Sequence, residues 1–283
     1  MKKMGILGPQ GTHSEEAAIY FKNFFAEEIE LVICSEIFEV LSAVEDGQLD
    51  SGFVPVENSL EGSINITLDT LARTDFLQVT HELIWPVHNY LMAKPGVAEI
   101  KKIFSHAQPI SQCRKYLREN FPDAEIISTP STARAAEIVA ESEIFDGCAA
   151  ICTKRAGELN NLIEIAEEIQ DNMANSTRFF EVERKKIFDK KNLCGDKMLI
   201  ICQIDGKKSG ALYEILKEFA VRNVNMTRIE SRPARTELGE YIFFFDLETD
   251  IDEKILSESV EAVSKKSIWL KKLGKFPVIS ATK

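Results

Sequence analysis

The segment Met4-Gly5-Ile6-Leu7-Gly8-Pro9-Gln10-Gly11-Thr12 contains the pattern that decides the fold. A short apolar strand, Met4 to Leu7, is followed by a glycine-rich turn. Thr12 then begins a helix, with Glu15 as its expected capping-box partner. Apolar residues recur along this helix at helical spacing, which predicts a buried stripe made of Ala17, Ala18, Phe21, Phe24 and Phe25. The alternation of strand and helix continues to about residue 180, so the sequence predicts an α/β architecture with a mostly parallel sheet.

The chain is expected to divide into two unequal parts. Residues 1–183 would form the larger part, as two α/β lobes with a cleft between them. The charged segment 184–197 offers few core residues and is interpreted as a linker. Residues 198–276 then follow the order βαββαβ, which is typical of a ferredoxin-like module.

Composition excludes several classes of protein. The 283 residues are 45% hydrophobic, enough to fill real cores. Lys and Arg number 34 against 45 Asp and Glu, and the resulting net charge of −11 argues against nucleic acid as a partner. No apolar run approaches the roughly 20 residues that span a bilayer, so no membrane partner and a cytoplasmic location are expected. The 6 cysteines form no C-x-x-C pair and are predicted to be reduced and buried, without a metal site.

Polar side chains follow two of the predicted strands, Gly52–Val56 and Ile103–Phe104. Ligands of open α/β sheets bind beyond the carboxyl ends of strands, so these side chains are candidates for a ligand site. Ordinary capping of the helices that follow explains several of them equally well. The candidates are Glu57, Asn58, Ser59, Ser105, Gln108 and Gln112.

Two further segments suggest binding of an anion. The helix that begins after Thr12 offers free backbone N–H groups, although a tight turn alone would explain its glycines. The spacing is not G-x-G-x-x-G, so a nucleotide is not favoured. Later in the chain, Arg178 could bind a carboxylate through two parallel hydrogen bonds, with the Thr177 hydroxyl beside it and Phe179 next. The pattern from Thr177 to Val182 is equally that of a final strand.

The C-terminal module carries candidates of its own. Its first helix begins at Gly210, Ala211 and Leu212, where free N–H groups could meet a ligand carboxylate. Its second strand is flanked by Asn225 and by Glu230-Ser231-Arg232-Pro233, of which Glu230 could bind an ammonium group. The alternative is an edge strand that simply ends at Pro233.

Taken together, these segments resemble prephenate dehydratases that carry a C-terminal ACT domain. The resemblance extends over nearly the whole chain. It departs from the family at three positions: His13 stands where the family usually has Tyr or Phe, Ala107 where it usually has Pro, and Pro109 where it usually has Ala. The matching strings, in order, are Gly8-Pro9-Gln10-Gly11-Thr12, Pro55-Val56-Glu57-Asn58-Ser59, Ser105-His106-Ala107-Gln108, Ser131-Thr132-Ala133, Asn175-Ser176-Thr177-Arg178-Phe179 and Glu230-Ser231-Arg232-Pro233.

The resemblance implies a fold, an activity and a regulator. The larger part would resemble type 2 periplasmic binding proteins and convert prephenate to phenylpyruvate, CO2 and water without metal or organic cofactor. Thr177 would donate to the leaving hydroxyl and Arg178 would anchor the pyruvyl carboxylate. The implied substrate-binding set is Thr12, Glu57, Asn58, Ser59, Ser105, Gln108, Gln112, Arg178 and Phe179.

The ACT domain would bind L-phenylalanine where two copies meet, in a homodimer or tetramer, and inhibit the enzyme. The implied effector-binding residues are Gly210, Ala211, Leu212, Asn225, Glu230, Ser231, Arg232 and Pro233. Two other functions stay open on the sequence: an arogenate dehydratase with the same chemistry, and a phenylalanine sensor without activity.

Overall fold

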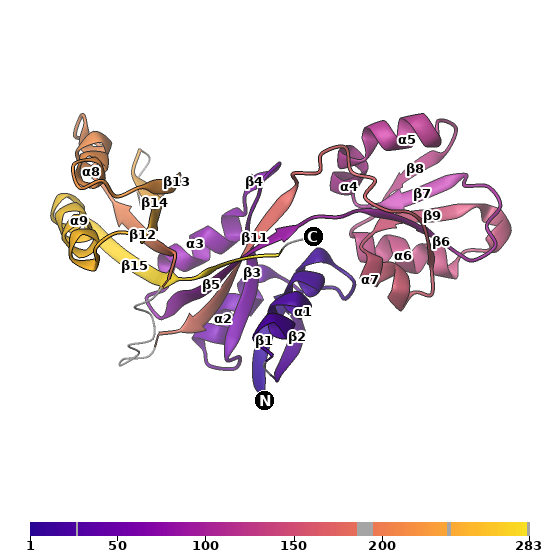
Figure 1. The fold of residues 1–283 in the computed structure, drawn as a ribbon, viewed down its shortest axis with the longest axis horizontal. Helices are drawn as coiled ribbons and strands as arrows, with labels where there is room; N and C mark the ends of the chain where they lie inside the picture. Colours follow the sequence, from indigo (N-terminus) through magenta and orange to yellow (C-terminus); the bar gives the residue numbers. More distant parts are fainter. Residues whose placement is uncertain (27, 186–194, 237–238, 282–283) are drawn as a thin grey trace.

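The computed structural model describes residues 1–26, 28–185, 195–236 and 239–281 and arranges them in three parts (Figure 1). A seven-stranded sheet forms the first lobe, a five-stranded sheet the second lobe, and a four-stranded sheet the C-terminal module. The second lobe and the C-terminal module lie at opposite ends of the first lobe, which therefore has two boundaries.

The first lobe has helices on both faces of its sheet. Its strands are β1 (Lys2–Leu7), β2 (Ile29–Cys34), β3 (Ser51–Asn58), β4 (Gly62–Ser63), β5 (Leu77–Pro86), β11 (Ser176–Arg184) and β16 (Val278–Ser280). Its helices are α1 (His13–Phe25), α2 (Ile37–Glu45) and α3 (Asn65–Arg73). As the helical spacing predicts, α1 buries Ala17, Ala18 and Phe21 against one face, with Phe25 partly buried beside them, while α2 and α3 pack on the other. The prediction is wrong for Phe24, which is exposed near the end of α1.

Only part of this sheet is parallel, so the prediction of a mostly parallel sheet is wrong here. The order is β16-β5-β11-β3-β1-β2, with β4 paired to β3. Strands β1, β2 and β3 are parallel, whereas β11 is antiparallel to both β3 and β5. The chain leaves the first lobe along β5 and returns along β11. These two neighbouring strands therefore run in opposite directions.

The second lobe is the excursion between β5 and β11. Its strands are β6 (Tyr90–Ala93), β7 (Lys102–Ser105), β8 (Glu125–Ser128), β9 (Cys148–Cys152) and β10 (Ile163–Ala166), in the order β10-β6-β9-β7-β8. Its helices are α4 (Ala107–Gln112), α5 (Arg114–Asn120), α6 (Thr132–Glu141) and α7 (Lys154–Leu159), with a short 3-10 turn at Ile144–Asp146. The apolar, β-rich stretch from Leu83 to Ala93 is divided between β5 and β6 and so between the two lobes.

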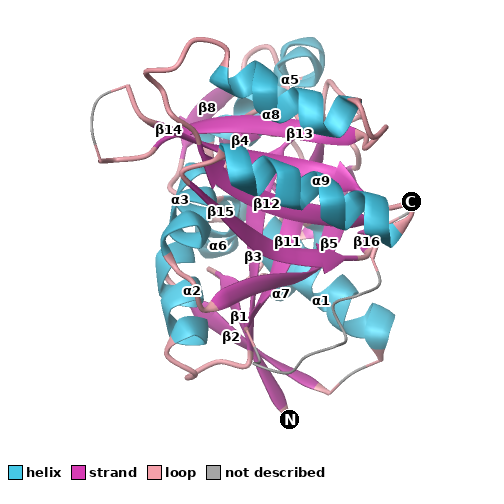
Figure 2. Ribbon diagram, turned by 90° about the vertical axis from the view of Figure 1, so that its left-hand side faces the viewer, coloured by secondary structure: helices cyan, strands magenta, loops and turns pink. Residues whose placement is uncertain are grey.

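The C-terminal module has the predicted order βαββαβ. Its elements are β12 (Lys197–Gln203), α8 (Ala211–Ala220), β13 (Met226–Pro233), β14 (Tyr241–Glu248), α9 (Glu253–Lys266) and β15 (Trp269–Phe276). The sheet is antiparallel in the order β13-β14-β12-β15, and α8 and α9 cover its outer face (Figure 2). The predicted linker 184–197 falls largely on residues 186–194, outside the described residues. Its two ends, Arg184 and Lys197, belong to β11 and β12.

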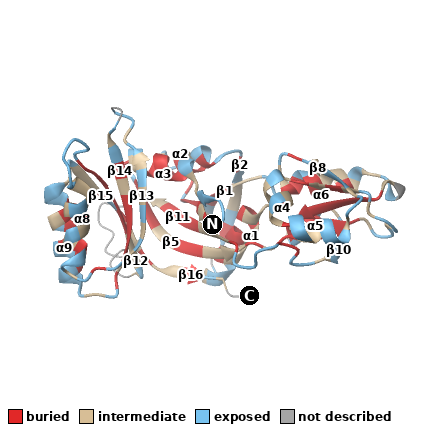
Figure 3. Cartoon of the chain, turned by 90° about the horizontal axis from the view of Figure 1, so that it is seen from above, coloured by how far each residue is buried: buried red, intermediate tan, exposed pale blue. Residues whose placement is uncertain are grey.

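The inner face of the module shares a hydrophobic core with the first lobe. Ile201 and Phe244 of the module belong to the same buried cluster as Val54 and Phe180 of the first lobe. Figure 3 shows buried segments, in red, on strands of both parts. The sequence does not predict that the chain then returns to the first lobe, where β16 pairs with β5. A Cβ atom on Gly274 would lie 2.3 Å from the Val79 carbonyl oxygen, so only glycine allows this close approach.

The described part of the chain bears on two expectations from composition, the absence of membrane-spanning segments and the state of the cysteines. No helix there is long and apolar enough to cross a bilayer. Cys34, Cys113, Cys148, Cys152 and Cys202 are free and buried, while Cys194 lies outside the described residues. Burial raises the pKa of the Cys113 and Cys152 thiols to about 12, so both stay protonated at neutral pH.

Candidate active site

A cavity of about 310 Å³ lies between the two lobes. This volume is at the lower end of the roughly 300–1,000 Å³ that small-ligand sites occupy. The first lobe contributes the start of α1, the end of β3 and the start of β11, and the second lobe contributes the starts of α4 and α6. The lining residues are Leu7, Thr12, His13, Ser14, Pro55, Asn58, Ile64, Val87, His106, Gln108, Pro109, Gln112, Pro130, Ser131, Thr132, Asn175, Thr177 and Phe179. No Asp, Glu, Lys or Arg is among these described lining residues.

A chain of neutral hydrogen bonds crosses the cavity wall. The Asn58 amide nitrogen donates to Asn175 Oδ1 at 2.9 Å and to Thr177 Oγ1 at 3.0 Å. Asn175 in turn donates to Gln112 Oε1 at 3.0 Å. The buried Gln112 Nε2 has no hydrogen-bond partner among the described residues and remains available to a ligand. This chain links the two lobes without any charged group.

The orientation of Asn58 fixes the role of the Thr177 hydroxyl. Asn58 Oδ1 accepts from the backbone N–H groups of Leu60 and Glu61, so its amide nitrogen must face Thr177. Thr177 Oγ1 therefore accepts from Asn58, and its own O–H is left to donate into the cavity. A hydroxyl oriented in this way is suited to stabilise a departing oxygen.

Alternation along β11 separates Thr177 from Arg178. Thr177 and Phe179 face the cavity, where Phe179 stacks on Phe53 with ring centroids 5.0 Å apart. Arg178 faces the C-terminal module instead and does not line the cavity, so the expectation that it grips a substrate carboxylate is wrong in this structure. Successive side chains of a strand point to opposite faces, and therefore adjacent residues of this motif cannot share one site.

Glu57 departs from expectation for the same reason. It precedes Asn58 on β3 and faces away from the cavity, where its carboxylate pairs with Arg178 and Arg228. Two of the predicted serines also lie outside the cavity lining. Ser59 donates to the Ala174 carbonyl and accepts from the Ser176 N–H, which ties the end of β3 to the start of β11.

Ser105 is completely buried and has a structural role. Its Oγ donates to the Ile151 carbonyl at 2.7 Å, inside the second lobe. The remaining predicted residues do reach the cavity: Thr12, Asn58, Gln108, Gln112, Thr177 and Phe179 all line it. The sequence thus identifies the cavity but not which members of each motif face it.

Two helices, one from each lobe, direct their N-termini at the cavity. Thr12, His13 and Ser14 begin α1, and Ser131 and Thr132 lie at the start of α6. The sequence does not predict His13, Ser131 or Thr132 as site residues, although Ser131 and Thr132 lie in a matching string. Both helix starts favour negative charge at the cavity wall.

His13 adds a neutral ring rather than a cation. Burial lowers the pKa of His13 to about 4, so its imidazole is uncharged at neutral pH. His106 has a local role as well, because its Nδ1 accepts from the Gln108 N–H and caps α4. The described lining of the cavity therefore contains no Lys or Arg, and His13 adds no positive charge at neutral pH.

The glycine-rich turn before α1 brings the two lobes together. Gly11 has φ +78°, and a Cβ on it would lie 2.9 Å from Ala156 of α7. Its carbonyl accepts from the Thr153 hydroxyl at 2.7 Å, across the lobe boundary. The expected capping box is absent: Thr12 donates to the Pro9 carbonyl, and Glu15 accepts from Gly11 N–H instead.

The effector candidates of the C-terminal module fall into two groups. Gly210, Ala211 and Leu212 lie at the start of α8, and Asn225 donates to Glu248 at 2.8 Å. On β13, Glu230 and Arg232 face the first lobe, while Ser231 and Pro233 are exposed on the other side. The effector role of these eight residues stays a prediction.

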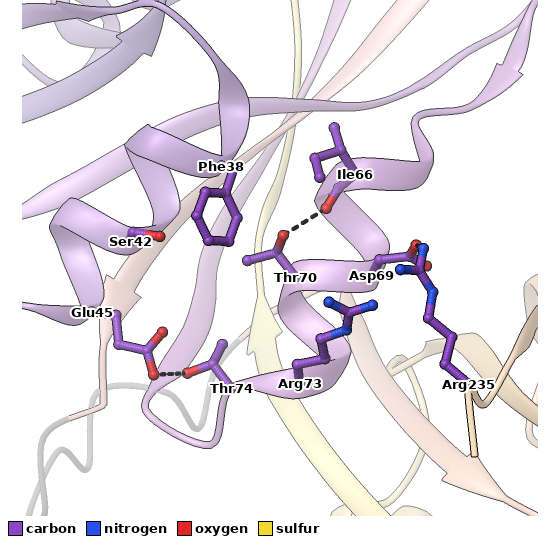
Figure 4. A pocket seen from close by; sticks show the side chains of 9 residues that line it. All are labelled: Phe38, Ser42, Glu45, Ile66, Asp69, Thr70, Arg73, Thr74 and Arg235. Carbon is purple, nitrogen blue, oxygen red and sulfur yellow. Dashed lines mark hydrogen bonds and ion pairs between the residues drawn. The ribbon is translucent and has the colours of Figure 1, made fainter.

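Polar side chains of β13 contact the first lobe. Glu230 accepts from the Ser63 hydroxyl at 3.0 Å, and Arg232 pairs with Asp69 at 3.1 Å. Arg235, which follows β13, also pairs with Asp69 beside a pocket of about 200 Å³ between α2 and α3 (Figure 4).

The described residues hold no group of three or more His, Cys, Asp or Glu side chains placed to bind a metal ion. The expectation that the reaction needs none stays a prediction.

Comparisons with known proteins fit this architecture. The family model for prephenate dehydratase matches residues 4–187. A prephenate dehydratase of Methanocaldococcus jannaschii is 37% identical over 270 residues, which cover 95% of this chain and 96% of that protein. A prephenate dehydratase from Arthrobacter aurescens, solved in complex with L-Phe, has a TM-score of 0.86 at 32% identity and covers 98% of this chain and 90% of its own.

The fold itself occurs with another activity. A protein described as a novel type of quorum quenching acylase has a TM-score of 0.85 at 25% identity, with 98% of both chains covered. The assignment therefore depends on the sequence-based matches as well as on the shape. On the evidence of the family model and of a relative that is similar over nearly its full length, the chain belongs to the prephenate dehydratase family.

Proposed function

We propose that this chain catalyses the decarboxylating dehydration of prephenate to phenylpyruvate in the cavity between its lobes. The observation that carries the proposal is the hydrogen bond from Asn58 to Thr177, which leaves the Thr177 hydroxyl free to donate into a cavity whose described lining holds no Asp, Glu, Lys or Arg. The enzyme is then a carbon–oxygen lyase of phenylalanine biosynthesis.

The substrate carboxylates meet helix N-termini rather than an arginine. Prephenate is a dianion, and the starts of α1 and α6 approach the cavity from opposite lobes. Partial positive charge at these ends, with hydroxyls of Thr12, Ser131 and Thr132 nearby, supplies anion recognition of moderate strength. Moderate strength suits this reaction, because a tight ion pair to the ring carboxylate would stabilise the ground state that must lose CO2.

The reaction itself needs little from the protein beyond position and a hydrogen bond. The electron pair of the breaking C–CO2 bond enters the ring, which becomes aromatic as its hydroxyl departs and takes up a proton to leave as water. Thr177 donates a hydrogen bond to that oxygen as negative charge develops on it. A threonine hydroxyl is too weak an acid to supply the proton alone, so the proton reaches the oxygen by relay from solvent.

The cavity favours prephenate over arogenate. Arogenate carries an ammonium group where prephenate has a keto oxygen, and no carboxylate lines the described cavity to pair with that ammonium. Incubating the purified protein with each substrate tests both points. Phenylpyruvate formed from prephenate, with a higher kcat/KM than for arogenate, is expected. Absence of phenylpyruvate would leave a phenylalanine sensor without activity.

The C-terminal module acts as an ACT domain that binds L-phenylalanine, and the two lobes belong to the type 2 periplasmic-binding-protein class. The complex of the Arthrobacter aurescens relative with L-Phe supports this regulation. Strand β13 lies at an edge of its sheet and exposes Ile229, while α8 exposes Tyr213 and Val221. An edge strand of this kind can pair with the same strand of a second copy, which would form a dimer or tetramer.

Calorimetry with L-phenylalanine and light scattering test this regulatory assignment. Phenylalanine binding by an oligomer is expected, and a monomer that does not bind it would contradict the assignment. The cytoplasmic location is part of the same proposal and is checked by cell fractionation.

A further inference from the structure

A buried ion cluster lies directly behind the cavity wall. The Arg178 guanidinium bonds Glu57 at 2.8 Å, Glu82 at 2.6 Å and Asp246 at 2.7 Å. Lys197 adds a second cation to Glu82 at 2.8 Å. We name Arg178, Glu57, Glu82, Asp246 and Lys197 the Arg178 cluster.

The cluster joins the first lobe to the C-terminal module. Glu57, Glu82 and Arg178 come from β3, β5 and β11 of the first lobe, whereas Asp246 and Lys197 come from β14 and β12 of the module. Glu82 and Asp246 are 0% and 1% exposed. Burial opposes the charge on Arg178, but Asp246 and Glu82 together raise the pKa of its guanidinium, so it stays ionised.

Two members of the cluster, Arg178 and Glu57, are each adjacent in sequence to a residue that lines the cavity. Thr177 lies opposite Asn58 in the β11–β3 ladder, and Arg178 lies opposite Glu57 in the next position. The ladder then shifts register between Arg178 and Phe179. One pair of residues therefore faces the substrate and the adjacent pair faces the module, at a point where the strand is irregular.

Asp246 is not fully satisfied in this arrangement. Its Oδ2 bonds Arg178, but its buried Oδ1 has no hydrogen-bond partner among the described residues. An unsatisfied buried carboxylate oxygen is costly, so a shifted position of the module that supplies a donor would compete with the present one.

We propose that the Arg178 cluster positions Thr177 and Asn58 for the reaction and makes their spacing depend on where the C-terminal module places Asp246. This inference rests on the proposed function. Arg178 is thus a positioning residue, and Asp246 is the contact through which the state of the module reaches the cavity. Residues 178 and 246 never touch the substrate.

The test compares Asp246→Asn with Asp246→Glu, which restores the charge, and with Asp250→Asn, an exposed acidic position in the same module. Asp246→Asn is expected to lower kcat on prephenate about tenfold with KM within about twofold, and to weaken inhibition by phenylalanine. Asp246→Glu should recover most of the loss, and Asp250→Asn should behave as the wild type. Unchanged kcat and unchanged inhibition in Asp246→Asn would overturn the proposal, and so would equal losses in Asp246→Glu.

Hydrogen exchange gives a readout that does not need turnover. The amides of residues 176–179 should exchange faster in Asp246→Asn than in Asp250→Asn, even if the wild type proves inactive on prephenate. Unchanged exchange contradicts the inference independently of the proposed function. If Asp246→Asn does not fold, Arg228→Gln removes the ion pair, 3.1 Å long, that joins Arg228 of the module to Glu57 of the cluster. It should show the same changes in kcat, inhibition and exchange to a smaller degree, and wild-type behaviour would contradict the proposal.

Discussion

The two boundaries of the first lobe are built from opposite chemistry. Toward the second lobe, the sheet presents a cavity lined by amides, hydroxyls and neutral rings. Toward the C-terminal module, it presents a shared hydrophobic core and the buried Arg178 cluster. Both boundaries use the same two strands, β3 and β11, whose alternate residues face opposite ways.

Under the proposed function, one face of this sheet serves the reaction and the other holds the C-terminal module. The cavity side keeps full charges away from an anionic substrate. The module side instead holds the charged groups of the Arg178 cluster. These groups are buried, so each needs a well-placed partner of opposite charge. Substitutions at the module boundary, at the cavity boundary and at a separate ion cluster around Glu181 test whether the two boundaries have these different roles.

The largest effect on stability is expected for Arg178→Ala. It leaves the buried carboxylates of Glu82 and Asp246 facing one another without the guanidinium, which should cost about 3–5 kcal/mol of unfolding free energy. Urea denaturation measures the loss. Arg134→Ala, which removes an exposed arginine paired with Glu137, is the matched control and should change little. An equally small change for Arg178→Ala would mean that the cluster does not stabilise the module boundary.

Acid stability should come from a separate ion cluster at the far end of β11. Burial alone would raise the pKa of Glu181, but hydrogen bonding to His81 and the charge of Lys2 hold it at about 2, below the ordinary 4.5. Between these values the unfolded chain binds more protons, so this stabilisation is present above pH 4.5 and lost as the pH falls toward 2. It amounts to at most about 3 kcal/mol.

Urea titrations of Glu181→Gln at several pH values check this expectation. The variant should be less stable than the wild type at pH 7 and nearly equal to it near pH 2. Glu183→Gln, a more exposed partner of the same Lys2, is the control and should shift stability far less. A constant difference across the whole pH range would contradict the assignment.

On the cavity side, Asn58→Asp should lower kcat by about 10- to 100-fold. A carboxylate keeps the bonds from Leu60 and Glu61 N–H but cannot donate to Thr177, and it adds negative charge beside an anionic substrate. Steady-state kinetics measure the loss, with the exposed Asn120→Asp as the control. Wild-type kcat in Asn58→Asp would remove this hydrogen bond from the mechanism.

The sequence predicts the helices, the strands and the position of the motifs well. It does not predict which side chains of each motif point into the cavity. Helical spacing correctly places Ala17, Ala18 and Phe21 in the core but wrongly includes the exposed Phe24, and the order βαββαβ is confirmed. Motif strings locate the cavity because strand ends and helix starts gather there. Arg178 and Ser105 lie outside the cavity although their motifs reach it, because adjacency in a motif does not show which residues face the ligand.

Other features depend on contacts between segments far apart in the sequence. The return of β16 to β5, the antiparallel β11 and the Asp246–Arg178 pair join residues that no local pattern connects. His13 reaches the cavity because α1 directs its N-terminus there, which only the packing of the lobes decides.

The most direct test of this division is the kcat for prephenate of Thr177→Val beside Thr177→Ser. Valine keeps the shape and removes the hydroxyl, whereas serine keeps the hydroxyl. We expect Thr177→Val to lose at least about 100-fold in kcat with an unchanged fold and Thr177→Ser to stay within about tenfold of the wild type. A Thr177→Val variant that turns over prephenate at nearly the wild-type rate would contradict the account.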